Sequence, residues 1–269
     1  MPSLRISIVT PSYNQAQFIR RTIDSILSQR GDFVLDYRVF DGGSKDDTVE
    51  ILKSYGDQFR WISEKDHGQI DAINKGLRAV DGDVVGWVNS DDVLMPGALD
   101  RVARAFNEHP TVEWVHGRCK IIDEHDHEIR RWVSLYKHYR CRHHTFSNLL
   151  TENYVSQMTA FWRRSVHDEI GYLDPEHDLA FDYDLFLKLA RRGDPIYLDD
   201  PIACFRMYDT SKSGAGYVAQ VEQANAIAAR YTAPSSWTRA RMRAKKAAIV
   251  NVYRAMGLAR ATLQRRPSP

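Results

Sequence analysis

Cysteine is scarce in this sequence, and the three residues of this type, Cys119, Cys141 and Cys204, are far apart. An odd number of cysteines with no C-x-x-C pair argues against a disulfide framework and a zinc ribbon. The sequence also has no run near the roughly 18 apolar residues that a membrane-spanning helix requires. Its first residues, MPSLRISIVTPSYN, lack the apolar core of a signal peptide. We therefore expect a cytoplasmic protein with reduced thiols.

Net charge is also small, but it is unevenly distributed along the chain. The formal net charge is only +2, so no global basic field indicates a nucleic-acid partner. After Glu222 there is no acidic residue, while arginine and lysine recur to the end of the chain. This contrast predicts a C-terminal segment with a positively charged surface.

Glycine is missing from the turn after the first predicted strand, where residues 10–17 read TPSYNQAQ. A dinucleotide-dependent dehydrogenase needs G-x-G-x-x-G here, because glycine lets the backbone approach a pyrophosphate. A nucleotidyltransferase that makes sugar nucleotides would need a glycine-rich, basic phosphate loop in the same place. Both enzyme classes are therefore disfavoured.

Short β-branched runs alternate with segments of helical periodicity. We predict strands at 5–10, 36–41, 60–63 and 83–89. Helices are predicted over 18–27, from a cap at Ser44 or Asp46, and over 70–80. This alternation predicts an α/β fold, with a Rossmann-like, mainly parallel sheet flanked by helices on both faces.

Polar segments follow all four predicted strands: TPSYNQ, DGGSKDDT, EKDHGQ and NSDD. The carboxyl ends of parallel strands meet at one edge of the sheet, where ligands bind. The last segment places Asp91 beside Asp92, and adjacent carboxylates repel each other unless a cation or hydrogen-bond donors compensate. A divalent cation with hard oxygen ligands would compensate this charge and would also bind a diphosphate.

Five segments carry a resemblance to a known family. They are ISIVTPSYNQAQFIRRTIDSILSQ, DGGSKDDT, EKDHGQIDAINKGLRAVDGDVVGWVNSDD, QMTAFWRR and GYLDPEHDLAFDYDLFLKLARRG, in this order. Together they resemble the inverting glycosyltransferases of family two, which have the GT-A fold. The resemblance extends over roughly residues 4–212. It implies the transfer of a sugar from a nucleotide-diphosphate donor.

The resemblance assigns donor-binding roles to residues at the strand ends. The nucleotide base and ribose would contact Thr10, Pro11, Tyr13 and Asp41. Asp66 and Asp71 resemble positions of the donor pocket, with a first-turn helix acid as the alternative for Asp71. Gln157 and Trp162 would face the sugar and the acceptor, with a role in the core as the alternative for the tryptophan.

The family's metal-binding D-x-D motif matches Asn89, Ser90 and Asp91, followed by Asp92. An amide replaces the first carboxylate, so metal binding rests on Asp91 and Asp92, and either could be the direct ligand. The cation would be Mn²⁺ or Mg²⁺, and Asn89 and Asp92 would contact the donor diphosphate. Many relatives place a histidine near the metal farther along the chain, where this sequence has Tyr208.

An inverting transfer needs a base that accepts the proton of the acceptor hydroxyl. The resemblance assigns this role to Asp182, in the segment AFDYDLFLKLA at the start of a predicted helix. Asp184 is the rival, and its alternative role is a carboxylate that complements the helix dipole.

The segment DEHDHE, residues 123–128, contains two histidines and could indicate zinc. A zinc site needs further ligands at a matching spacing, and no such pair follows. A solvated hairpin turn is therefore the favoured interpretation.

We divide the chain into a catalytic domain, residues 1–215, and a C-terminal segment, residues 216–269. In this segment Val252, Met256 and Leu263 recur at helical spacing, and basic residues lie on another face. The pattern predicts a basic amphipathic helix that either packs on the domain or contacts an anionic membrane.

The function implied is metal-dependent, inverting transfer from a nucleotide-diphosphate sugar, a UDP-sugar being favoured, to a hydroxyl of a glycan or lipid-linked acceptor. Such an enzyme would take part in polysaccharide biosynthesis for the cell envelope, in the cytoplasm at the inner face of the membrane. The alternative is a non-catalytic sugar-nucleotide-binding or membrane-associated scaffold protein. The presence of Asp182 together with Asp91 and Asp92 favours the enzyme.

Overall fold

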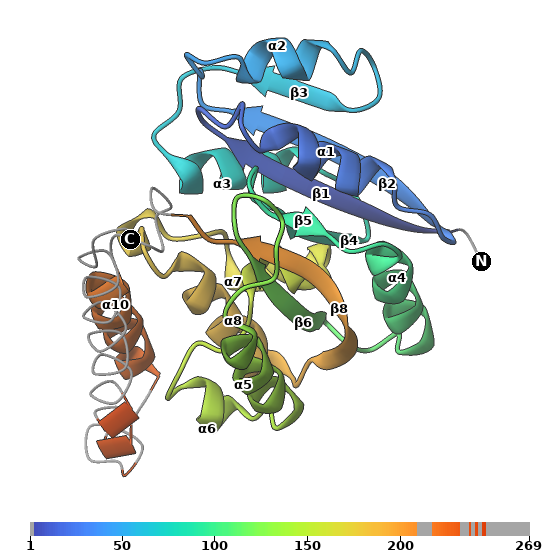
Figure 1. Ribbon diagram of the computed structural model, residues 1–269. Coiled ribbons are helices and arrows are strands. Elements are labelled where there is room, and N and C mark those ends of the chain that lie inside the picture. Colours follow the sequence, from blue (N-terminus) through green and yellow to red (C-terminus); the bar gives the residue numbers. More distant parts are fainter. Residues whose placement is uncertain (1–2, 209–216, 232–236, 238–239, 242–243, 246–269) are drawn as a thin grey trace, which may run out of the picture.

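Four parallel strands form the first half of the sheet, as the alternating pattern predicts (Figure 1). The computed structural model describes residues 3–208, 217–231, 237, 240–241 and 244–245. The strand β1 (Leu4–Ser12) pairs with β2 (Phe33–Asp41) on one side and β4 (Val84–Trp87) on the other, and β3 (Arg60–Ser63) pairs with β2. The chain changes direction across the sheet between β1 and β4, where open α/β sheets bind ligands.

The second half of the sheet is mixed. The strand β7 (Phe161–Arg163) is antiparallel to both β4 and β6 (Trp114–Ile122). The strand β8 (Ile196–Arg206) is parallel to β6, and the short β5 (Val93–Leu94) is antiparallel to β8. The described strands form one sheet in the order β3-β2-β1-β4-β7-β6-β8-β5.

Helices cover both faces of this sheet. The core on one face includes residues of α1 (Ile19–Leu27) and α4 (Ala98–Glu108), and the core on the other includes residues of α3 (Gln69–Ala79) and α8 (Phe181–Arg192). Adjacent residues of a strand point to opposite faces, so Ile8 belongs to the first core and Val9 to the second. Burial on both faces explains why the central β4, with the sequence VVGW, carries no polar side chain that could face solvent.

The remaining helices connect these layers. They are α2 (Thr48–Lys53), α5 (Arg131–Arg142), α6 (Phe146–Leu149), α7 (His167–Ile170) and α10 (Tyr217–Arg230), with short 3₁₀ turns η1 (Gln157–Thr159), η2 (Arg164–Val166) and η3 (Pro175–His177). The helix predicted from Ser44 or Asp46 begins at Thr48, where the backbone N–H donates to Asp46 over 3.1 Å.

The helix α10 packs against α8, and Ile227 and Ala228 of α10 are buried. The predicted domain boundary at residue 215 lies outside the described residues, as does the range 246–269 with most of the predicted amphipathic helix. Within the described ranges, no helix combines the length and apolar character that crossing a bilayer takes.

Candidate active site

Asp41 ends β2 and organises the loop that follows. Its Oδ2 accepts hydrogen bonds from the backbone N–H groups of Gly43 and Ser44, over 3.1 and 2.9 Å, and from the hydroxyl of Ser63 over 2.6 Å. Gly43 has a φ of +79°, a conformation that favours glycine. The DGGS segment is therefore a tight loop built around a buried carboxylate.

A small pocket, with an empty volume of about 160 Å³ that includes open solvent, lies beside this loop. Its lining consists of Phe40, Asp41, Ile62, Glu64, Asp66, Ala72 and Lys75. Gly42 makes room for the Asp66 side chain, because a Cβ at Gly42 would lie 2.6 Å from Oδ2 of Asp66. The fold thus brings Asp41 and Asp66, two of the predicted donor-binding residues, to one pocket.

The three residues predicted to bind the donor at the end of β1 differ in accessibility. Thr10 is fully buried, and its hydroxyl accepts a hydrogen bond from Tyr37 over 3.1 Å. Pro11 is buried as well, whereas the Tyr13 side chain is 56% exposed. The Thr10 hydroxyl is committed to the core, and Tyr13 is the side chain accessible to a ligand.

Asp71 lies in the first turn of α3. Its Oδ2 accepts a hydrogen bond from the backbone N–H of His67 over 3.1 Å and pairs with Lys75 at 3.3 Å. The His67 hydrogen bond is the main cause that lowers the pKa of Asp71. These contacts agree with the alternative of a first-turn helix acid.

Asp92 is fully buried, and two protein donors contact its carboxylate. Its Oδ1 accepts a hydrogen bond from the backbone N–H of Arg206 over 3.0 Å, and its Oδ2 accepts one from the amide of Asn89 over 3.1 Å. Burial, followed by the charge of Asp91, raises the pKa of Asp92 well above 3.8. Because Asp92 has no exposed surface and each of its oxygens accepts a hydrogen bond from the protein, its predicted role as a metal ligand is less favoured than that of Asp91.

Asp91 is the accessible carboxylate of the pair. It is partly exposed, and its Oδ2 accepts a hydrogen bond from the hydroxyl of Tyr208 over 2.9 Å. Burial raises the pKa of Asp91, and the Tyr208 hydrogen bond and the positive charge of Arg206 oppose this rise. Tyr208 therefore lies beside the accessible candidate for metal binding.

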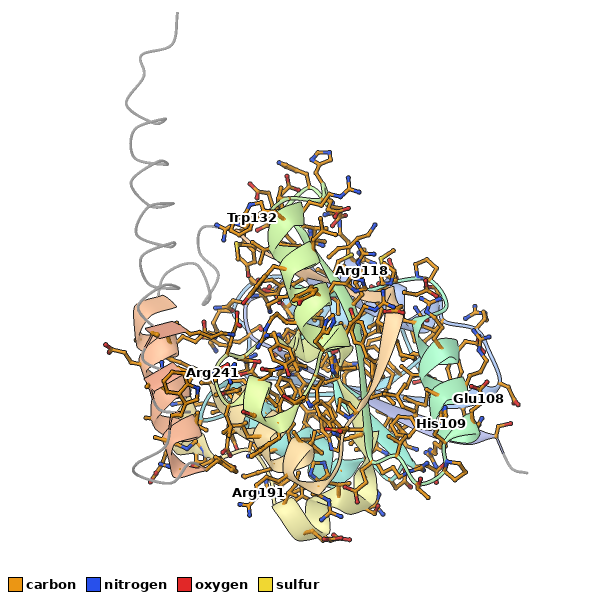
Figure 2. The ribbon with its side chains drawn as sticks, turned by 90° about the horizontal axis from the view of Figure 1, so that it is seen from below. Glu108, His109, Arg118, Trp132, Arg191 and Arg241 are labelled. Carbon is orange, nitrogen blue, oxygen red and sulfur yellow. The ribbon has the colours of Figure 1, made fainter. Side chains whose placement is uncertain are left out.

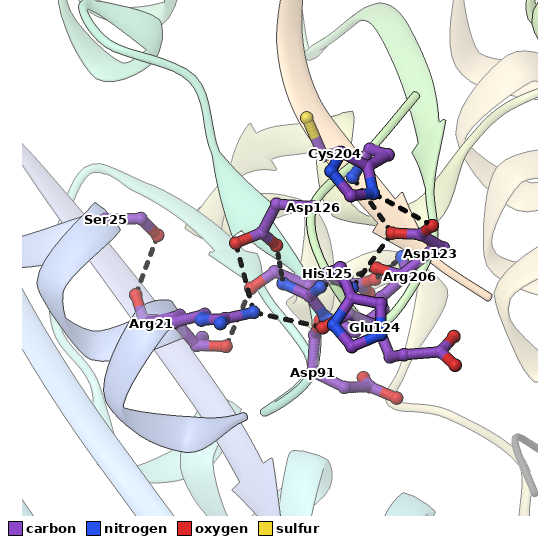
Figure 3. Close-up of polar contacts among 12 residues, drawn as sticks. Arg21, Ser25, Asp91, Asp123, Glu124, His125, Asp126, Cys204 and Arg206 are labelled. Atoms are coloured by element: carbon purple, nitrogen blue, oxygen red, sulfur yellow. Dashed lines mark hydrogen bonds and ion pairs between the residues drawn. The ribbon is translucent and has the colours of Figure 1, made fainter. Parts of the chain in front are cut away.

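Arg206, at the end of β8, is fully buried and holds the SDD segment in place (Figure 3). Its Nε donates to the backbone carbonyl of Asp91 over 2.9 Å, and its guanidinium pairs with Asp126 at 2.6 Å. The guanidinium also lies over the ring of Phe18, 4.8 Å from the centroid. Sequence reasoning missed this residue, although a single arginine inside the apolar strand segment IACFRM was a signal that could have found it.

The histidine-rich segment 123–128 forms a hairpin turn after β6, as predicted. Asp123 accepts hydrogen bonds from the backbone N–H groups of His125 and His127, each over 2.9 Å. Arg21 on α1 pairs with Asp126 at 3.1 Å, so the turn is tied to both α1 and Arg206 (Figure 3). In the described part of the chain, no three His, Cys, Asp or Glu side chains are grouped to hold a metal by themselves.

Asn89 belongs to a chain of amide groups at the end of β4. Its Oδ1 accepts a hydrogen bond from Gln69 over 2.9 Å, and its Nδ2 lies 3.4 Å from Oε1 of Gln157. Gln157 in turn donates to the backbone carbonyl of Trp87 over 2.7 Å. These uncharged groups fix the backbone next to Asp91.

Trp162, predicted to face the sugar or acceptor, lies instead in the core. The side chain is fully buried, and its indole N–H donates to His167 over 3.2 Å. Its ring also packs edge-on against Trp87, with 5.6 Å between centroids. This burial and these contacts favour the alternative of a role in the core.

Asp182 lies in the first turn of α8. This turn is near the end of β4, as the distance of 6.1 Å between the ring centroids of Phe181 and Trp87 shows. Part of the Asp182 side chain is exposed, but protein surrounds most of it. Burial raises the pKa of Asp182, and the hydrogen bond from the Tyr183 N–H (2.8 Å) and the charge of Lys137 on α5 oppose this. A partly accessible carboxylate with a raised pKa has the properties of a general base.

Asp184 has structural contacts. Only 6% of it is exposed, and its carboxylate pairs with Lys188 at 2.9 Å and accepts a hydrogen bond from Tyr231 over 3.1 Å. These contacts link α8 to the end of α10. Of the two acids at the start of α8, Asp182 is the more accessible.

The end of β4 fits a divalent cation whose coordination is completed by a ligand. Asp91 offers a partly exposed carboxylate, and its backbone is fixed by Arg206. Mg²⁺ and similar hard cations are commonly held by one or two carboxylates together with substrate phosphates and water. One carboxylate at this position is therefore sufficient if a diphosphate supplies further oxygens.

The model of glycosyl transferase family 2 matches residues 7–171, more than half of the chain. An uncharacterized glycosyltransferase of Rickettsia prowazekii is 28% identical over 198 residues, which cover 73% of this chain and 62% of the relative. One of Rickettsia felis is 27% identical over 212 residues, which cover 73% of this chain and 33% of the relative. The chain thus spans only part of the length of these relatives.

Solved structures share the fold. The structure of S. aureus TarS 1–349 in complex with UDP-GlcNAc matches with a TM-score of 0.64 and 19% identity, covering 92% of this chain and 72% of that one. The mannosyltransferase PcManGT from Pyrobaculum calidifontis, in complex with GDP-Man and Mn²⁺, matches with a TM-score of 0.60 and 17% identity, covering 95% and 81%. The predicted GT-A fold is confirmed.

Proposed function

The chain belongs to glycosyl transferase family 2, and we propose that it transfers a sugar from a nucleotide-diphosphate donor to an acceptor hydroxyl. The observation that carries the proposal is the position of Asp91, a partly exposed carboxylate at the end of β4. It lies at the sheet edge where Asp41 and Asp66 line a pocket. Open α/β sheets bind their ligands at this edge.

The donor proposed is a UDP-sugar. Its base would enter the pocket beside Asp41 and Asp66, where the half-exposed Tyr13 is an additional candidate contact. TarS, which shares the fold, has been solved with UDP-GlcNAc, and this supports UDP as the first nucleotide to test. The complex of PcManGT with GDP-Man makes GDP the second.

Asp91 would hold Mn²⁺ or Mg²⁺ together with the donor diphosphate. When bound, such a cation stabilises the negative charge that develops on the leaving diphosphate. Asp92 would help to position Asp91, because its hydrogen bonds with Arg206 and Asn89 fix the backbone next to Asp91. The complex of PcManGT with Mn²⁺ supports the choice of metal.

Asp182 would act as the general base of a single displacement. Its carboxylate accepts the proton of the acceptor hydroxyl as the acceptor oxygen bonds to the anomeric carbon. The bond from that carbon to the diphosphate oxygen breaks at the same time, and attack from the opposite side inverts the configuration. The positive charge of Lys137 opposes the rise of the Asp182 pKa and so favours the ionised form that acts as the base.

The acceptor proposed is a glycan or a lipid-linked hydroxyl in cell-envelope polysaccharide biosynthesis, with the enzyme in the cytoplasm at the inner membrane face. The division into a catalytic domain and a basic C-terminal segment remains part of this proposal. A non-catalytic sugar-nucleotide-binding protein is the competing function, and the accessible Asp182 argues against it.

A thermal-shift panel of UDP and GDP, each with Mn²⁺ and with a chelator, tests donor binding, because a ligand of the native state raises the melting temperature. We expect a metal-dependent shift with UDP. The anomeric configuration of the product, measured by NMR, then tests the displacement. No shift with any nucleoside diphosphate would refute the donor assignment, and retained configuration would refute the single displacement.

A further inference from the structure

An apolar stripe runs along the outer side of α5. Its four members follow one another at a spacing of i, i+3, i+4 and i+7, which places them on one side of the helix: Trp132, Leu135, Tyr136 and Tyr139. Between 44 and 58% of each side chain is exposed. The opposite side of α5 is buried through Ser134 and Cys141. Figure 2 shows α5 on the outside of the molecule, with Trp132 at one end of it.

The stripe lies in a basic segment. No acidic residue occurs between Glu128 and Glu152, whereas this stretch holds five basic residues: Arg130, Arg131, Lys137, Arg140 and Arg142. Arg131 and Arg142, at the two ends of α5, are exposed together with the stripe, and Arg142 pairs with the exposed Asp199 at 3.5 Å. Glu152 borders the stripe, where it accepts a hydrogen bond from Tyr136 over 2.8 Å and pairs with Arg140 at 3.4 Å. Exposed tryptophan and tyrosine with flanking arginines are typical of a helix that lies in the interface of an anionic bilayer.

The inner side of α5 carries Lys137, whose positive charge opposes the burial that raises the pKa of Asp182. The Nζ of Lys137 donates to the hydroxyl of Ser156 over 3.4 Å. One helix therefore contributes a charge next to Asp182 on one side and an apolar, basic surface on the other. A bilayer in contact with the outer side of α5 would therefore lie on the side of Asp182 from which the charge of Lys137 acts.

We propose that the outer face of α5 docks the protein on an anionic phospholipid bilayer and that the acceptor is carried by a membrane lipid. The choice of lipid follows from charge, since the exposed arginines complement anionic headgroups while the four apolar side chains enter the interface. The docking is independent of catalysis, whereas the assignment of the acceptor rests on the proposed function.

Flotation of the full chain with vesicles tests the docking. We expect binding to vesicles of phosphatidylcholine with phosphatidylglycerol at low salt, weaker binding at high salt, and little binding to phosphatidylcholine alone. Arg131→Gln and Arg142→Gln should each weaken binding about fivefold, as expected for a basic residue at an anionic surface. Trp132→Ser combined with Tyr139→Ser should abolish it.

Two matched controls carry the same chemistry elsewhere. Val34→Ser removes a half-exposed apolar side chain from β2, and Arg104→Gln removes an exposed arginine from α4. Both should float like the unmodified protein. A second measurement uses Tyr139→Cys labelled with an environment-sensitive dye, which is selective because Cys119, Cys141 and Cys204 are buried. Its emission should shift to the blue only with anionic vesicles.

The docking is overturned if the full chain does not bind anionic vesicles, or if the α5 variants float like the unmodified protein. It is also overturned if light scattering shows that the unmodified protein is an oligomer and that the α5 variants are monomers, because α5 would then be a protein interface. Binding of UDP in solution is measured separately. Flotation without UDP binding would refute the proposed donor and keep the docking, whereas UDP binding without flotation would refute the docking alone. A water-soluble glycan used as well as a lipid-linked acceptor would refute the acceptor assignment.

Discussion

Tyr208 and Asp91 are joined by a hydrogen bond of 2.9 Å, in which the phenol donates to Oδ2 of the carboxylate. Burial and the charge of Asp91 raise the pKa of Tyr208 to about 12, so the phenol keeps its proton near neutral pH. A hydrogen bond to a carboxylate favours the ionised form. Tyr208 therefore helps Asp91 to carry the negative charge that a cation would need.

Replacing Tyr208 tests this relationship. Tyr208→Phe removes the donor, so the pKa of Asp91 should rise further. Metal-dependent UDP binding should then reach half of its maximum at a higher pH than in the unmodified protein. Calorimetric titrations with Mn²⁺ over a range of acidic pH measure the shift. Tyr55→Phe, which removes a phenol bonded to Asp24, is the control and should leave the profile unchanged.

Asp91 and Asp92 should respond differently to truncation. Asp91→Ala should reduce Mn²⁺-dependent UDP affinity by tenfold or more, on the order expected when a hard cation loses its carboxylate. Asp92→Ala should mainly reduce stability, by about 1–3 kcal/mol for each buried donor left without an acceptor. Calorimetry and urea unfolding separate the two effects. Loss of metal dependence in Asp92→Ala with normal stability would contradict the assignment.

Gly42 should matter for the pocket and not for the fold. The added Cβ of Gly42→Ala would meet the Asp66 carboxylate at 2.6 Å, so this side chain must move and UDP affinity should fall about tenfold. Gly193→Ala is the control, because a Cβ at this position meets nothing within 4 Å. Equal UDP affinity in both variants would place the nucleotide elsewhere.

Asp182 should affect turnover and leave donor binding intact. Loss of general-base assistance typically costs on the order of 10² to 10⁴ in rate, and we expect this for Asp182→Asn with unchanged UDP affinity. Because burial raises the pKa of Asp182 above 3.8, the protonated, inactive form persists to higher pH than for an ordinary aspartate. The rate should therefore fall as the pH falls through this raised pKa, and Asp182→Asn should lose this dependence.

Asp184→Asn is the matched control for that experiment. It sits in the same helical turn, and its contacts with Lys188 and Tyr231 are structural. We expect lower stability with most of the turnover retained. An active Asp182→Asn together with an inactive Asp184→Asn would move the base to Asp184.

His116 should make the protein acid-sensitive. It is fully buried and stacked on Trp114, with 5.4 Å between ring centroids. Burial, with a contribution from His144, lowers its pKa from 6.5 to about 3, so between these values the unfolded chain binds a proton that the folded protein does not. Above pH 6.5, His116 is neutral in both states and does not reduce the free energy of unfolding. As the pH falls from 6.5 towards 3, the free energy of unfolding decreases by up to about 1.4 kcal/mol per pH unit.

Urea unfolding at several pH values checks this sign. The free energy of unfolding of His116→Phe should fall less steeply with acidification than that of the unmodified protein. The exposed His109→Phe should behave like the unmodified protein. Parallel curves for all three proteins would show that His116 is protonated equally in both states.

Particular residues show how far sequence reasoning reached. The strand at residues 60–63 was predicted at both ends, because Trp61 and Ile62 lie between polar segments that limit the strand. Asp41 and Asp66 were predicted at one edge from the parallel order alone, and one pocket contains both. Trp162 was assigned to the substrate and lies in the core, because exposure depends on which segments cover a residue.

The sequence likewise could not predict that Asp91 is partly exposed while Asp92 is buried. The two residues are neighbours with identical side chains, and local pattern cannot distinguish them. The decision comes from Arg206, 114 positions after Asp92, whose backbone N–H donates to Asp92. A partner so far along the chain becomes a neighbour only when β8 is placed in the sheet.

The sequence by itself determined the α/β architecture and the edge of the sheet that holds the polar residues, because periodicity and the alternation of strands and helices are local properties of the chain. It indicated the family through the resemblance of five segments. The tertiary structure decided which carboxylates are accessible, which are compensated by protein donors, and which side of α5 is left exposed. These properties depend on burial and on contacts between distant segments. They arise only when the sheet and its covering helices are packed together.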